Sequence, residues 1–265
     1  MGINKKNVVI ANLKMYLPSK NDANRWLENF VRAEKNFNPE QTILVICPPI
    51  IFLNEFAKKI TASWIDFGAQ NCFWENEGSY TGEIGARMIS SSGGKFVILG
   101  HSERRRELKE NNQMIAKKIV HLLKNGLHPI VCVGETDLEK KQDKTMEVIL
   151  CQLEECLREV GRSKIEDVIV CYEPVWAISS NQPNRNPSVN EIMGAKLLIK
   201  KFLVNKYGLK SAERVKIIYG GSVDDKNTEK VCLETKISGV LVGKAGATPH
   251  TLLRICQVLE DKNKN

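Results

Sequence analysis

Residues 168–174 read Val-Ile-Val-Cys-Tyr-Glu-Pro, an uninterrupted apolar run that ends at a single carboxylate. A run this short and rich in β-branched residues is typical of a strand buried on both faces of a parallel sheet. Parallel strands need crossover connections, and the amphipathic stretch at residues 189–206 can supply one. The segment therefore predicts one strand-then-helix unit with a polar residue at the end of its strand.

The same unit recurs along the whole chain. The predicted strands are residues 8–13, 42–46, 64–69, 95–99, 129–133, 168–172, 215–219 and 238–242. The predicted helices are residues 19–36, 50–60, 83–90, 111–124, 138–160, 189–206, 225–233 and 249–260. Eight such units in about 250 residues match a closed (β/α)8 barrel. An open doubly wound sheet is the alternative, but that fold usually has GxGxxG after its first strand, and no such motif follows here.

Length and composition indicate one ordinary globular domain. The chain has 265 residues, of which 42% are hydrophobic and 26% charged, and these values exclude a disordered or low-complexity protein. No Pro/Gly/Ser-rich linker divides it, so we expect a single domain over residues 1–265 with an ordered core at about 7–260. The formal charge of +8 is dispersed among acidic residues. It therefore favours a small anionic substrate over nucleic acid.

The cysteines and apolar runs bear on cofactors and location. Eight cysteines lack CxxC spacing and several lie in apolar runs, so we expect reduced, buried thiols in a cytoplasmic protein. None of the four histidines is paired with cysteine, and we expect no metal site. No apolar run reaches 18 residues, which argues against a membrane span. Residues 1–6 lack the apolar core of a signal peptide.

In a barrel of this class the chemistry lies at the C-terminal ends of the strands. Asn12 and Lys14 follow the first predicted strand, and His101 follows the fourth. Ser102 is the expected N-cap of the next helix. The partial positive charge at that helix start disfavours an imidazolium, so we expect His101 to be neutral. Each of these side chains, taken alone, could equally be structural.

Glu173 stands at the end of the sixth predicted strand, where partial burial should raise its pKa toward that of a useful base. The alternative is a structural ion pair. Residues 174–176 are stiff and bulky, whereas residues 177–187 are small, polar and punctuated by proline. Stiff ends around a polar tip suit a hinged lid, although a plain surface loop has the same composition.

Glycine pairs follow the last two predicted strands. Gly220 and Gly221 precede Ser222, and Gly243 and Gly246 flank Lys244 and Ala245. This is the usual phosphate position of a barrel, where backbone N–H groups face the anion. A base, a neutral hydrogen-bond donor, a lysine and a phosphate cradle together suit proton abstraction next to the carbonyl of a small sugar phosphate.

With these residues in place, the chain resembles the triosephosphate isomerase family over about residues 8–259. The matching motifs are residues 12–15 (Asn-Leu-Lys-Met), 100–105 (Gly-His-Ser-Glu-Arg-Arg), 172–178 (Tyr-Glu-Pro-Val-Trp-Ala-Ile) and 219–223 (Tyr-Gly-Gly-Ser-Val). Residues 69–83 resemble the loop with which that family forms dimers. Four motifs in the family's order and spacing are far more specific than any one of them.

The resemblance implies interconversion of dihydroxyacetone phosphate and D-glyceraldehyde 3-phosphate through an enediolate, without a metal or organic cofactor. It implies that Glu173 is the base, that neutral His101 polarises the carbonyl, and that Lys14 and Asn12 stabilise the negative oxygen. Further implied roles are phosphate binding by backbone groups near Ser179, Ser222, Gly243 and Lys244 with Gly220 and Gly221, support by Glu103, and homodimer contact by Thr81.

Two loops depart from the family pattern. Residues 179–182 read Ser-Ser-Asn-Gln where Gly-Thr-Gly-Lys is usual, and residues 243–246 read Gly-Lys-Ala-Gly where Gly-Gly-Ala-Ser is usual. Asn181 tolerates left-handed backbone better than most residues, so lid closure can survive. The Lys244 side chain could strengthen anion binding or point outward, and we favour outward. These changes leave two alternatives, an isomerase of four-carbon ketose phosphates and a catalytically silent phosphate-binding barrel.

Overall fold

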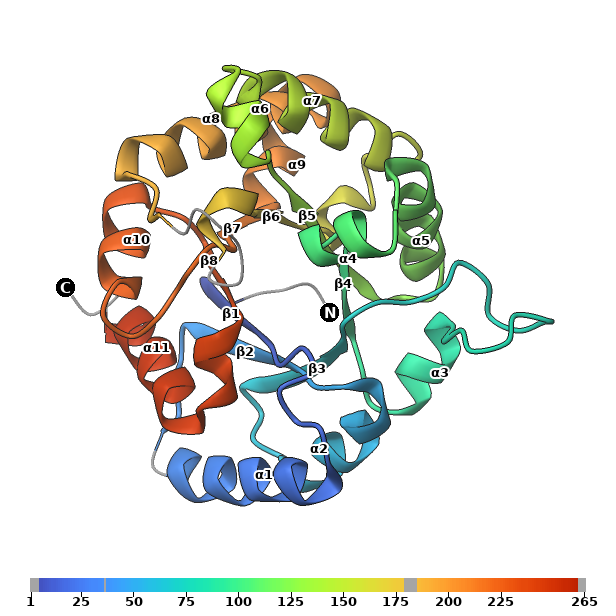
Figure 1. Cartoon of the computed structure of the whole chain (residues 1–265), viewed down its shortest axis with the longest axis vertical. Coiled ribbons are helices and arrows are strands. Elements are labelled where there is room, and N and C mark those ends of the chain that lie inside the picture. The colour runs from blue at the N-terminus through green and yellow to red at the C-terminus, as the bar shows by residue number, and fades with distance from the viewer. Residues whose placement is uncertain (1–4, 36, 179–184, 262–265) are drawn as a thin grey trace.

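A closed barrel of parallel strands forms the centre of the molecule, with helices around it (Figure 1). The computed structural model describes residues 5–35, 37–178 and 185–261, and within them eight strands pair in sequence order from β1 to β8, with β8 returning to β1. The predicted (β/α)8 barrel is therefore confirmed. Among the described helices, none combines the length and apolarity that crossing a bilayer requires.

The bounds of the elements follow the predicted alternation. The strands are β1 (Asn7–Asn12), β2 (Thr42–Cys47), β3 (Ile65–Ala69), β4 (Phe96–Leu99), β5 (His128–Val133), β6 (Ile169–Tyr172), β7 (Lys216–Tyr219) and β8 (Gly239–Val242). The α-helices are α1 (Lys20–Glu34), α2 (Leu53–Lys59), α3 (Ala86–Ser91), α4 (Ser102–Glu107), α5 (Asn112–Lys124), α6 (Asp137–Lys141), α7 (Thr145–Cys156), α8 (Val189–Tyr207), α9 (Leu209–Arg214), α10 (Thr228–Thr235) and α11 (Pro249–Asp261). Short 3-10 helices are η1 (Ile50–Phe52), η2 (Ile165–Asp167), η3 (Val175–Ala177) and η4 (Lys244–Ala247).

The strands are apolar on both faces because each face packs against a different part of the core. Val8 and Ile10 of β1 belong to the cluster inside the barrel, whereas Val9 and Ala11 belong to the layer between the barrel and the helices. All four side chains are fully buried. Successive side chains of a strand point to opposite faces, so a strand buried on both faces loses the alternation of polar and apolar residues.

The predicted helix at residues 138–160 is wrong as a single element. It divides into α6 and α7, and Asp143 between them has a positive φ of 56° that ends the first helix. Thr136 caps α6 in a capping box with Glu139, a start signal at the sequence level. The predicted helix at residues 83–90 begins only at Ala86. The start of the short helix α4 was expected at Ser102 but its extent was not, and the short helix α9 was not predicted.

The barrel closes between β8 and β1, where the two backbones come unusually close. Gly239 pairs with Val8 and has a φ of +154°. A Cβ atom on Gly239 would lie 1.8 Å from the Val8 carbonyl oxygen. Only glycine satisfies both the backbone conformation and this approach.

Replacing Gly239 by alanine should therefore destabilise the protein by about 2–4 kcal/mol, because the strands at the closing seam must separate. Gly161→Ala is the matched control, since a Cβ there meets nothing within 4 Å and its φ is not positive. It should change stability by about 0.5 kcal/mol or less. Urea unfolding of both variants measures the difference, and equal stabilities would contradict the seam argument.

Candidate active site

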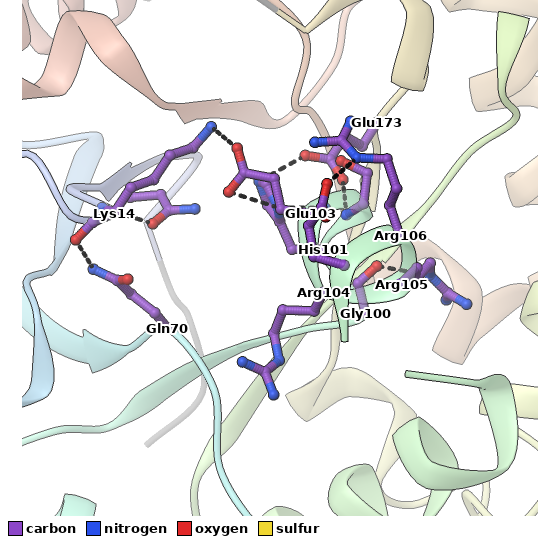
Figure 2. A network of polar contacts seen from close by, with 12 residues as sticks. Lys14, Gln70, Gly100, His101, Glu103, Arg104, Arg105, Arg106 and Glu173 are labelled. Atoms are coloured by element: carbon purple, nitrogen blue, oxygen red, sulfur yellow. Dashed lines mark hydrogen bonds and ion pairs between the residues drawn. The ribbon is translucent and has the colours of Figure 1, made fainter. Parts of the chain in front are cut away.

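Glu173 and His101 meet at the C-terminal end of the barrel (Figure 2). Glu173 directly follows β6, and His101 lies two residues after β4. The Glu173 Oε1 atom lies 2.9 Å from His101 Nε2, and Oε2 accepts a hydrogen bond of 2.9 Å from the Ser102 N–H. Both side chains are almost fully buried. The structure thus brings the expected base and the expected carbonyl-polarising group into direct contact.

His101 itself caps helix α4, so the prediction that Ser102 is the N-cap is wrong. The His101 Nδ1 atom accepts a hydrogen bond of 3.3 Å from the Glu103 N–H, and Ser102 is the first helical residue. Because Nδ1 accepts, the proton of a neutral ring stays on Nε2, which faces the Glu173 carboxylate. This arrangement selects the tautomer that can donate a hydrogen bond into the cavity.

In the substrate-free structure the pKa of His101 is raised above that of a free imidazole. The helix start alone had indicated a lowered pKa. Burial lowers this pKa, but the negative charge of Glu173 and its hydrogen bond raise it more, and Glu103 adds to the rise. The prediction of a neutral ring omitted the Glu173 carboxylate, which the fold places in contact with it. The pKa of His101 therefore depends on where that carboxylate lies.

Lys14 reaches the same site from β1 and is paired with Glu103. Its Nζ atom lies 2.7 Å from Glu103 Oε1. Burial raises the pKa of Glu103, but the hydrogen bond from Lys14 and the nearby positive charges lower it more, so the pKa of this carboxyl is below its usual value. The pair links the end of β1 to α4 across the barrel mouth.

The backbone of Lys14 is held in a conformation that is rare for a non-glycine residue, with φ of 44°. The Asn12 Oδ1 atom accepts a hydrogen bond of 3.2 Å from the Lys14 N–H, and Gln70 donates one of 3.0 Å to the Lys14 carbonyl. Sequence reasoning missed Gln70 in this role, because nothing in the sequence marks its contact with β1. Figure 2 shows the contact between Gln70 and Lys14.

A cavity of about 240 Å³ lies against these groups. Lys14, His101 and Glu173 line it. The expected phosphate residues line the same cavity, and they are Gly220, Gly221, Ser222, Gly243 and Lys244. Asn12 does not line it and lies instead at a neighbouring cavity of about 300 Å³, which Lys14 and His101 also line. The strand ends thus bring most of the predicted set around one small space.

Ser222 is engaged with the start of the loop that follows β6. Its N–H and its hydroxyl donate to the Ala177 carbonyl at 2.9 and 2.8 Å. This N–H is occupied in the structure, and a phosphate can use it only after the Ala177 carbonyl moves away. Ser179 and the rest of the altered lid tip, residues 179–182, lie outside the described residues, in the segment 179–184.

A second buried carboxylate, Glu135, was missed by sequence reasoning. It accepts hydrogen bonds of 2.9 Å from Trp176 Nε1 and 3.2 Å from the Tyr172 hydroxyl, and its carbonyl accepts one from the Val175 N–H. It is fully buried. Like Glu173 it follows a strand end, and that position was the available signal. Glu135 anchors the loop that carries Trp176 on the side away from the cavity.

Thr81, the predicted dimer contact, does not line the cavity. It is exposed on the loop between β3 and α3, which projects beyond the ring of helices (Figure 1).

Within the residues that the structure describes, no group of three or more His, Cys, Asp or Glu side chains could hold a metal ion. The absence of a metal or cofactor stays an expectation.

Comparison with known proteins gives one consistent result. A family model described as Triosephosphate isomerase matches residues 7–259. The protein named triosephosphate isomerase from Dictyoglomus thermophilum is 37% identical over 251 residues, which cover 95% of this chain and 98% of that relative. The one from Thermoanaerobacter sp. strain X514 is 36% identical with the same coverage. The one from Natranaerobius thermophilus is 33% identical over 257 residues, covering 96% and 95%.

The contact between His101 and Glu173 predicts a shift in titration. Glu173→Gln removes the negative charge that raises the pKa of His101 and leaves the burial that lowers it, so this pKa should fall. Nitrogen-15 NMR of the imidazole over a pH series measures it in both proteins without substrate. A variant pKa equal to or above that of the wild type would contradict the assigned cause.

Proposed function

The chain belongs to the triosephosphate isomerase family, and from this premise we propose that it interconverts dihydroxyacetone phosphate and D-glyceraldehyde 3-phosphate without a cofactor. The observation that carries the proposal is the 2.9 Å contact between Glu173 and His101 beside the cavity that Lys14 lines. A carboxylate base and an N–H donor at one small space suit proton transfer between neighbouring carbons of a hydroxycarbonyl compound.

The substrate-free contacts suggest how the reaction begins. The Glu173 carboxylate accepts from Ser102 and faces His101, so both of its oxygens have partners. A substrate carbonyl that takes the His101 Nε2–H frees one of these oxygens. The carboxylate then leaves the start of α4 and removes a proton from the carbon next to the carbonyl.

The negative charge moves from Glu173 to the substrate oxygen when the proton is removed. His101 donates its hydrogen bond to that oxygen, and the Lys14 ammonium stabilises it electrostatically. Asn12 supports Lys14 through the hydrogen bond to its N–H. Glu103 keeps Lys14 oriented through their 2.7 Å pair. His101 gives its Nε2 proton to the former carbonyl oxygen and takes one back from the neighbouring hydroxyl oxygen, which becomes the new carbonyl oxygen. Return of the proton from Glu173 to the former carbonyl carbon completes the isomerisation.

We assign the phosphate group to the part of the cavity lined by Gly220, Gly221, Ser222, Gly243 and Lys244, with Ser179 as a proposed further donor. The glycines allow a close approach to backbone N–H groups. Release of Ser222 from the Ala177 carbonyl would couple phosphate binding to movement of the loop after β6. No observation on the described residues favours a four-carbon substrate or a silent barrel.

We also propose a homodimer of one-domain chains, residues 1–265 each, in the cytoplasm. The loop that carries Thr81 projects from the barrel and is stiffened by Phe73, whose ring lies 4.1 Å from that of Trp74 and 4.6 Å from that of Tyr80. The cavity beside the active site is rimmed by Met15, which is 89% exposed. A projecting loop and an apolar rim suit mutual insertion by two copies. The seven buried free thiols are compatible with a reducing compartment.

A coupled assay with each triose phosphate tests the activity directly. The wild-type protein should convert both, and Glu173→Gln should lower kcat by about 10²–10⁴-fold, because an amide cannot accept the proton. Urea unfolding of the variant should show that the barrel remains folded. Absence of turnover by the folded wild-type protein at saturating substrate would refute the proposed function.

Thr81→Arg tests the proposed dimer. A guanidinium on the loop tip would be buried without a partner when two copies meet, so association should weaken. Thr81→Ser is the matched control, because it keeps the hydroxyl and adds no charge. Sedimentation velocity at micromolar concentration should shift toward the monomer for the arginine variant alone. Identical sedimentation of all three proteins would contradict the assigned interface.

A further inference from the structure

Lys244 occupies the rim of the active-site cavity. It is the first residue of η4, directly after Gly243, and lines the cavity on the side assigned to the phosphate. Unlike Lys14, whose side chain is 12% exposed, Lys244 is an exposed residue. A lysine side chain has a long, flexible stem, so its ammonium can reach over a short distance toward an anion at the rim.

The other charged groups that line the cavity already form ion pairs or hydrogen bonds within the protein. Lys14 is paired with Glu103 at 2.7 Å, and Glu173 faces His101. Asp224 also lines the cavity, but its Oδ1 atom accepts from the N–H groups of its own loop, at Lys226 and Asn227. Within the described part of the chain, Lys244 takes part in no ion pair.

The two lysines also lie at different depths. A Cβ atom on Gly243 would lie 3.6 Å from Lys14 Nζ, so the Lys14 ammonium packs against Gly243 on the inner side. Lys244 follows Gly243 along the chain and is exposed, whereas the Lys14 side chain is only 12% exposed. The buried ammonium is therefore placed for the reacting oxygens, and the exposed one for a group at the mouth of the cavity. A phosphate monoester carries a charge between −1.5 and −2 at pH 7.

The sequence alone led us to favour an outward-pointing Lys244, but this residue lines the cavity. We propose that the Lys244 side chain is a specificity-determining residue that binds the substrate phosphate and attracts the dianion to the cavity. This inference rests on the proposed function, and it assigns to the side chain a role beyond that of the backbone N–H groups. A charge-assisted hydrogen bond to phosphate adds affinity without touching the reacting carbons. Its loss should therefore raise KM more than it lowers kcat.

The test compares Lys244→Gln with Lys226→Gln, which removes the same charge from an exposed lysine that does not line the cavity. Lys244→Gln should raise both KM for triose phosphate and the inhibition constant of inorganic phosphate by about five-fold or more, and it should flatten the decline of kcat/KM with salt. Lys226→Gln should change each by about two-fold or less. Lys244→Arg should restore most of the loss, because it returns the cation.

Equal effects of the two glutamine variants would show that only net charge matters and would overturn the assignment. Unchanged inhibition by inorganic phosphate in Lys244→Gln would overturn it as well. If the wild-type protein shows no isomerase activity, the proposed function fails, and calorimetric titration with inorganic phosphate still decides the role of Lys244. Weaker phosphate binding by Lys244→Gln than by Lys226→Gln supports it in that case.

Discussion

The contact between the Glu173 carboxylate and the His101 imidazole depends on the parallel pairing of the strands. These residues are 72 positions apart and follow β6 and β4, which are both paired with β5. Parallel pairing puts the C-terminal ends of all strands at one mouth, and the short turn after β4 aims His101 at the end of β6. Glycine at position 239 lets the last strand reach the first, and this closure brings Gly243, which follows β8, beside Lys14, which follows β1. Pairing and closure together set the geometry of the site.

The resting site keeps each catalytic charge paired until a substrate arrives. Lys14 is held by Glu103, and Glu173 by His101 and the start of α4. Buried charges without partners are strongly destabilising, so these pairs make the empty site compatible with a stable barrel. In the proposed mechanism, a substrate that offers a carbonyl and a phosphate would take the place of these partners. The same side chains would then serve stability in the free protein and positioning in the complex.

The sequence predicts the barrel well because the strands are apolar on both faces, a pattern that local reading can detect. The sequence also predicts which side chains lie at the C-terminal mouth of the barrel, because every residue that directly follows a parallel strand lies there. Local sequence patterns do not predict the contacts of Gln70 and Glu135, because each partner lies on another part of the fold. They do not predict the raised pKa of His101 for the same reason. The division between α6 and α7 depends on the left-handed backbone of Asp143. Glycine is the usual sequence signal for such a backbone, and it is absent at this position.

The central claim is that Glu173 removes a proton from carbon and returns it to the neighbouring carbon. Turnover of dihydroxyacetone phosphate in deuterium oxide, followed by mass spectrometry and proton NMR of the product, tests it directly. A proton held on a carboxyl group exchanges with solvent, so deuterium should appear on the carbon that receives it. Product formed at the full rate with no deuterium bound to carbon would show a direct hydride shift between the carbons and contradict the account.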